Sequence, residues 1–154
     1  MGKECNLVIY IGIDPGKDGA AAMLWPDQTP AAIPFDKESY KTALKRVEQS
    51  LEPAICCLER VTARPGQGVV SMFRFGENYG FIQGLLVAYS IPYELVTPQK
   101  WKKEFQVTSD KNTSIAVCKR LFPGISLRKT PQSRTDHDGM AEALLLAMYA
   151  RRRL

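Results

Sequence analysis

The sequence contains a single histidine, His137, among its 154 residues. A metal site built from several histidines is therefore excluded, and a Ser-His-Asp triad would depend on that one residue. The cysteines include no CxxC pair, and Cys56 and Cys57 lie in an apolar run where they would point to opposite faces of a strand. We expect reduced core thiols at all four cysteines, which are Cys5, Cys56, Cys57 and Cys118. Carboxylates remain as the groups for acid–base or metal chemistry.

Long hydrophobic runs are also lacking. No stretch approaches the roughly 20 apolar residues that a membrane-spanning helix needs, and the N-terminus has no signal-peptide layout. No internal repeat, low-complexity tract or linker interrupts a composition that is 45% hydrophobic and 24% charged. We therefore expect one globular domain over residues 1–154 in an intracellular, cytoplasmic protein.

Acidic residues are fewer than basic ones, and 16 Asp and Glu against 21 Lys and Arg give a net charge of +5. The basic residues gather late in the chain, between Lys100 and Arg134 and again at residues 151–153. This clustering favours a polyanionic partner, and a merely solvated basic surface is the simpler alternative.

The first hydrophobic run, residues 7–13, stops at Asp14 in IGIDPGKDGA. Asp before Pro-Gly is ordinary turn chemistry, because Asp bonds its own downstream backbone and Gly16 accepts a positive φ. A second interpretation is an anion-binding loop of open backbone N–H groups at Gly12, Gly16 and Gly19, although the spacing is not that of a P-loop. A third is a metal-binding carboxylate at the end of a central strand, which requires partners elsewhere.

The hydrophobic periodicity predicts an α/β fold. We expect strands at 7–13, 20–25, 31–33, 54–58 and 93–96, with the first three forming an antiparallel meander. Helices are expected at 36–51, 69–90, 110–122 and 137–152, and Pro98 should open a further short basic helix. Gly76, Gly80 and Gly84 recur every four residues and indicate that the second helix packs closely on the sheet. The run at 54–58 is continuously apolar, which is typical of a buried parallel strand, and it also stops at a carboxylate, Glu59.

The last expected helix is apolar nearly all round and should be buried, yet it carries Asp138 and Glu142. Residues four apart share one face of a helix. Two like charges there repel each other and lose solvation unless a cation lies between them. Together with Asp14 and Glu59, these two residues make four acids that three elements could bring to one place. Such a set of carboxylates suits Mg²⁺. Two such ions about 4 Å apart can activate a water and stabilise the leaving oxygen of a phosphodiester.

Simpler interpretations exist for several acids. Glu59 could pair with Arg60 or Arg64, and Asp136 suits the N-cap of the last helix. Glu142 is the hardest to explain in this way, because it stands between two alanines in an apolar helix.

The order of these features resembles the RNase H-like superfamily. A strand ending in Asp14, a later strand ending in Glu59, and a terminal helix with Asp138 and Glu142 follow a three-strand meander. IGIDPG followed by LER is similar to the RuvC family of Holliday junction resolvases, and more closely to its branch of plant chloroplast, phage and bacterial resolvases. The similarity to that branch extends through VTARPGQGVVSMFRFGENYG, YELVTPQKWKK, LFPG and DHDGMAEALLLA, over residues 8–150.

The resemblance implies a mixed five-stranded sheet flanked by helices, and a homodimer that nicks two symmetry-related strands of a four-way DNA junction with Mg²⁺ or Mn²⁺. It implies catalytic and metal-ligating roles for Asp14, Glu59, Asp138 and Glu142. Relatives vary at the last two positions, so Asp136 or His137 could be a ligand instead.

Candidate DNA contacts follow from the basic residues together with the resemblance. The loop at 63–68 lies close after the second strand-end carboxylate, where Arg64, Gly66 and Gln67 could approach base edges. A structural turn is the alternative. Lys111 begins a helix and could meet a phosphate, or it could be a solvated lysine. Three further basic residues should follow the DNA backbone: Arg128, Lys129 and Arg134.

The sequence therefore predicts a Mg²⁺-dependent endonuclease that resolves four-way junctions through two-metal phosphodiester hydrolysis. A catalytically idle DNA-binding or scaffolding domain of the same fold is an alternative. A sugar-kinase or actin-like ATPase also begins with a strand ending in a Gly-flanked Asp, but it needs two such domains and a second phosphate loop, which this chain lacks.

Overall fold

The computed structural model describes residues 7–154, so Cys5 lies outside the described residues. Its five strands form one sheet in the order β3-β2-β1-β4-β5. They are β1 (Ile9–Asp14), β2 (Ala20–Leu24), β3 (Ala31–Pro34), β4 (Ala54–Glu59) and β5 (Tyr93–Val96). The first three pair antiparallel, whereas β4 runs parallel to both β1 and β5. The predicted mixed sheet and opening meander are confirmed.

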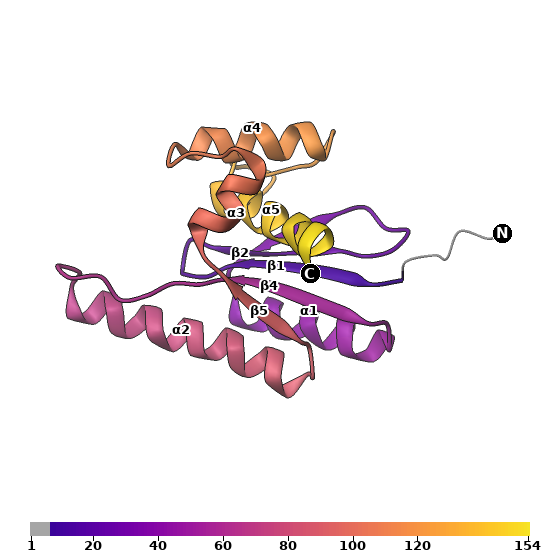
Figure 1. Cartoon of the computed structure of the whole chain (residues 1–154), viewed down its shortest axis with the longest axis horizontal. Coiled ribbons are helices and arrows are strands. Elements are labelled where there is room, and N and C mark those ends of the chain that lie inside the picture. Colours follow the sequence, from indigo (N-terminus) through magenta and orange to yellow (C-terminus); the bar gives the residue numbers. More distant parts are fainter. Residues whose placement is uncertain (1–6) are drawn as a thin grey trace.

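Helices cover both faces of the sheet, as Figure 1 shows, with α3, α4 and α5 on one side and α1 and α2 on the other. Their bounds are α1 (Lys37–Ser50), α2 (Val69–Ala88), α3 (Pro98–Phe105), α4 (Lys111–Leu121) and α5 (Asp138–Arg153). Among residues 7–154, no helix combines the length and the apolar character needed to cross a bilayer.

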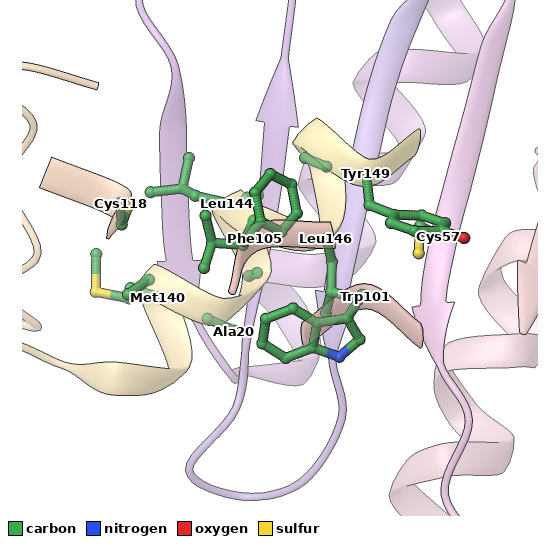
Figure 2. Packing of buried hydrophobic residues seen from close by; sticks show 14 of the residues in the cluster. Ala20, Cys57, Trp101, Phe105, Cys118, Met140, Leu144, Leu146 and Tyr149 are labelled. Atoms are coloured by element: carbon green, nitrogen blue, oxygen red, sulfur yellow. The ribbon is translucent and has the colours of Figure 1, made fainter. Parts of the chain in front are cut away.

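The sheet separates two hydrophobic clusters. One joins it to α3, α4 and α5 and includes Cys57, Trp101 and Phe105, which Figure 2 shows at close range. The other joins it to α1 and α2 and includes Cys56 and Tyr40. Because adjacent residues of a strand point to opposite faces, Cys56 and Cys57 enter different clusters, as the sequence predicts. Both are buried free thiols, and so is Cys118.

Gly12 lets α5 lie directly on the central strand. A Cβ atom at Gly12 would collide with the α5 backbone at Ala143 and Ala147. The hairpin after β1 uses its glycines differently, since Gly16 has a φ of +117° and its carbonyl accepts from the N–H of Gly19 at 3.1 Å. The predicted turn is thus confirmed, and close helix packing is the reason for Gly12.

The prediction that the glycine stripe of α2 packs on the sheet is wrong. A Cβ atom at Gly76, Gly80 or Gly84 would meet nothing within 4 Å. Only Ile82 and Leu86 of α2 are fully enclosed by the core, so the stripe lies on a surface that the described residues 7–154 leave open. Large apolar side chains of the same helix are also exposed: Val69, Val70, Phe73 and Val87.

Candidate active site

Two of the predicted acids lie side by side at the carboxyl ends of two neighbouring inner strands. Strands β1 and β4 are parallel, and their register pairs Ile13 with Leu58, so Asp14 and Glu59 are the next residues on neighbouring strands. Side chains two residues apart share a face, and Gly12 packs against α5. Asp14 therefore points to the side of the sheet that α5 covers.

The first two turns of α5 add the other two acids, Asp138 and Glu142. The Glu142 side chain comes within hydrogen-bond reach of the Asp14 carboxyl. Burial is the main cause of a strongly raised pKa at Asp14, followed by the charges of Glu142, Glu59 and Asp138. The structure thus brings together all four acids that the sequence singles out.

Glu59 is held from both layers of helices. The indole Nε1–H of Trp101 in α3 donates to Glu59 Oε2 at 2.7 Å, and the hydroxyl of Tyr79 in α2 donates to the Glu59 carbonyl at 3.2 Å. Burial raises the pKa of Glu59, the Trp101 hydrogen bond opposes it, and the nearby charge of Arg64 lowers it to a smaller degree. The indole, and not an arginine ion pair, is the direct partner of this carboxylate.

A lysine partners the fourth acid. Lys111 is the first residue of α4, as predicted, and Asp110 caps this helix by accepting from the N–H of Asn112. Lys111 Nζ lies 3.1 Å from Asp138 Oδ2, although 73% of the lysine side chain remains exposed. This hydrogen bond and the charge of Asp138 raise the pKa of Lys111. A surface cation therefore lies at the rim of the acidic cluster.

The prediction that Asp136 caps α5 is wrong. His137 is the N-cap, and its Nδ1 accepts from the N–H of Met140 at 3.0 Å. Asp136 instead forms ion pairs with Lys119 at 2.6 Å and Arg128 at 3.3 Å. Two nearby cations are stronger partners for a carboxylate than one backbone amide. Both residues considered as substitute ligands are thus engaged in structural contacts.

The four acids are close but are not arranged as a finished metal site. Within residues 7–154, no three Asp, Glu, His or Cys side chains are grouped tightly enough to hold an ion. Glu59 and Asp138 are bound to Trp101 and Lys111, and Asp14 and Glu142 lie next to each other. The charges of the other three acids nevertheless raise the pKa of Asp14, and oxygen donors of this kind are the ligands that Mg²⁺ prefers. The donor set therefore fits a divalent cation.

The loop after β4 borders a cleft of about 510 Å³. Arg64, Gln67, Lys17 and Arg74 line it together with Phe75, and no acidic side chain does. Gln67 Oε1 accepts from the backbone N–H of Arg64 at 3.3 Å, so this side chain also shapes the turn. Gly66 has a φ of +86° and open space around it. The cleft is thus a basic hollow beside Glu59.

The basic residues before α5 have different roles in the fold. Besides its ion pair with Asp136, the guanidinium of Arg128 donates to the Ser133 carbonyl at 3.0 Å. Arg128 therefore braces its own loop. Lys129 and Arg134 are exposed and remain available to a polyanion.

Comparison with solved structures identifies the architecture. RuvC from T. thermophilus in complex with a Holliday junction substrate matches with a TM-score of 0.60 at 13% identity, covering 94% of this chain and 96% of that chain. The chain has the RuvC fold. A second Thermus thermophilus RuvC structure matches this fold with a TM-score of 0.58 at 14% identity, again over 94% and 96% of the two chains. No protein-family model matches the sequence, and no curated protein does. The predicted RNase H-like architecture of the RuvC fold is confirmed.

The contacts that three residues make at this site were not predicted from the sequence. Trp101 lies in a short basic helix and Tyr79 in an apolar one, and neither position shows a local signal for contact with Glu59. The capping role of His137 could have been recognised from its place just before the first apolar turn, since N-caps occupy that position.

Proposed function

We propose that this protein is a Holliday junction resolvase, a metal-dependent endonuclease that cuts four-way DNA junctions by paired symmetric nicks. The observation that carries the proposal is the cluster of four carboxylates where β1, β4 and α5 meet in a RuvC fold. The matching T. thermophilus RuvC is in complex with a Holliday junction substrate. Mutually repelling acids in a partly buried position destabilise a fold, so their presence favours a function that uses them.

Asp14, Glu59, Asp138 and Glu142 would hold Mg²⁺ or Mn²⁺. When bound, the metal would supply an activated water and stabilise the charge that develops on the leaving oxygen. Asp14 feels charge from Glu59 on one side and from both α5 acids on the other. Asp14 would therefore hold the metal together with both groups of neighbours, Glu59 on the side of the leaving oxygen and the α5 acids on the side of the attacking water. Lys111 at the rim would bind a backbone phosphate.

The DNA would lie along the basic surface on both sides of the acids. Arg64, Lys17 and Arg74 offer cations in the cleft beside Glu59, and Lys129 and Arg134 continue the surface toward α5. Contacts of this kind neutralise phosphates, so junction affinity should fall as the salt concentration rises.

Paired cuts require two active sites related by symmetry. The exposed face of α2 suits a second copy of the chain, because it combines apolar side chains such as Phe73 with glycines that let another helix approach. A twofold interface brings the same patch of each copy together. We therefore propose a homodimer formed through α2.

The test is cleavage of mobile four-way junctions, fixed junctions, flaps and linear duplex side by side, with cut sites mapped on every strand. Symmetric paired nicks confined to junctions, dependent on Mg²⁺ or Mn²⁺, would support a resolvase. The loose arrangement of the four acids favours one other candidate, an idle junction-binding domain. Binding in EDTA without any nicking when either metal is added would support that candidate.

A further inference from the structure

The Glu59 carboxylate has a partner that no metal-based role requires. Trp101 donates its indole N–H to Glu59 Oε2 at 2.7 Å and is itself fully buried. Figure 2 shows the indole packed in the cluster with Leu146 and Phe105, with its ring nitrogen at the margin of that group. A tryptophan at this place brings a donor into an otherwise apolar region and points it at an acid.

The backbone fixes where this donor lies. Strand β5 ends at Val96, which pairs with Glu59, and the N–H of Arg60 donates to the Val96 carbonyl at 2.8 Å. Helix α3 begins two residues later, and in its first turn the backbone N–H of Trp101 donates to the Thr97 carbonyl at 3.3 Å. The indole therefore enters the core beside Glu59 from a helix that is itself tied to the neighbouring strand.

The chemistry of the indole limits what it can do. It is a donor only, with one N–H and no acceptor, and a hydrogen bond from it to an ionised carboxylate is stronger than one between neutral groups. Because the ring is enclosed on all sides, it cannot turn away without leaving its N–H unsatisfied. Tyr79 holds the backbone of the same residue from the opposite face of the sheet. Glu59 thus accepts a hydrogen bond at its backbone carbonyl and another at one carboxylate oxygen.

We propose that Trp101 is the positioning residue of Glu59: its indole N–H engages Oε2, fixes the carboxylate orientation and leaves Oε1 to the metal. This inference rests on the proposed function, because it assumes that Glu59 is a metal ligand. Groups that orient a ligand in this way change metal affinity by about 10–100-fold when they are removed.

The first measurement is Mn²⁺ affinity without DNA, by isothermal titration calorimetry, in Trp101→Phe and in the unchanged protein. The variant keeps an aromatic ring but loses the donor, so we expect Mn²⁺ binding to weaken at least about 10-fold. We also expect kcat on a junction to fall while the junction KM stays the same. Phe105→Leu is the matched control, since Phe105 lies one turn later in the same cluster and should lose stability without a change in Mn²⁺ affinity.

The second measurement uses Trp101 itself as a reporter. The chain has two tryptophans, and Trp25 lies under the Arg46 guanidinium at 4.6 Å, away from the acids. In a Trp25→Phe background the emission of Trp101 should change as Mg²⁺ is added, with a midpoint equal to the Kd for Mg²⁺ measured by calorimetry on the same variant. The change should disappear in Glu59→Gln, which keeps an acceptor for the indole but loses the charge.

The outcomes separate this inference from the proposed function. Wild-type Mn²⁺ affinity in a folded Trp101→Phe variant would overturn the inference even if the unchanged protein cuts junctions. If Trp101→Phe does not fold, the Trp25→Phe variant decides. A Trp101 emission that does not change at saturating Mg²⁺ would overturn the inference. A protein that binds neither Mn²⁺ nor Mg²⁺ would contradict both proposals.

Discussion

Replacing Asp14 by Asn should stabilise the metal-free protein. The same substitution should abolish junction cleavage when metal is present. The pKa of Asp14 is raised well above its ordinary value, first by burial and then by its three acidic neighbours. A folded-state pKa above the unfolded value means that ionised Asp14 destabilises the folded chain at neutral pH. Asn is nearly isosteric with Asp, carries no charge, and offers an amide donor toward the neighbouring carboxylates.

The expected gain is about 1–2 kcal/mol, within the range that single stabilising substitutions provide. For a chain of this length, 1 kcal/mol corresponds to about 2–4 °C in Tm, so the variant should melt about 2–8 °C above the unchanged protein in EDTA. With Mg²⁺ at a hundred times its Kd, the unchanged protein should gain about 2.7 kcal/mol from ligand binding. The variant should gain much less, because it lacks one ligand and one negative charge.

Differential scanning calorimetry at neutral pH, with and without Mg²⁺, tests these values, and gel-shift and cleavage assays on a four-way junction accompany it. We expect Asp14→Asn to bind the junction as before and to cut it no longer. A variant that melts below the unchanged protein in EDTA would refute the idea that the acids repel one another, and undiminished cleavage would refute the catalytic assignment.

Three further substitutions test the packing, the DNA surface and the dimer. Gly12→Ala should cost about 3 kcal/mol or more, because its methyl group would meet the α5 backbone; a urea melt equal to that of the unchanged protein would contradict the close packing. Lys129→Ala should weaken junction binding and reduce the salt slope by about one, whereas Lys45→Ala, at an exposed position of α1, should leave both unchanged. Phe73→Glu should leave the fold intact, since 68% of Phe73 is exposed, and should give monomers in sedimentation; dimers of unchanged stability would exclude α2 as the interface.

Much of the fold and of the acidic cluster could be predicted from sequence because their signals are local. A continuous apolar run indicates the buried strand before Glu59, and a carboxylate that ends such a run is conspicuous. The acids of α5 stand out for the same reason, since charge is unusual in a helix that is apolar all round.

The remaining features depend on contacts between distant segments. Trp101 meets Glu59 across 42 residues, and no pattern around either residue indicates that the two touch. Asp136 suits an N-cap by residue type, but it pairs with Lys119 and Arg128, which only the fold brings near, and His137 takes the capping position. A glycine stripe permits close approach of a neighbour but does not say whether that neighbour belongs to the same chain.

Helix α5 packs directly on Gly12, and this packing determines when the acidic cluster forms during folding. Asp14 and Glu142 are separated by most of the chain, and contacts of such long range form only after the intervening loops have closed. The acids therefore cannot meet before the central strand and α5 have docked. A partly folded chain therefore holds at most one half of the cluster, and the site to which we assign catalysis exists only once the fold is complete.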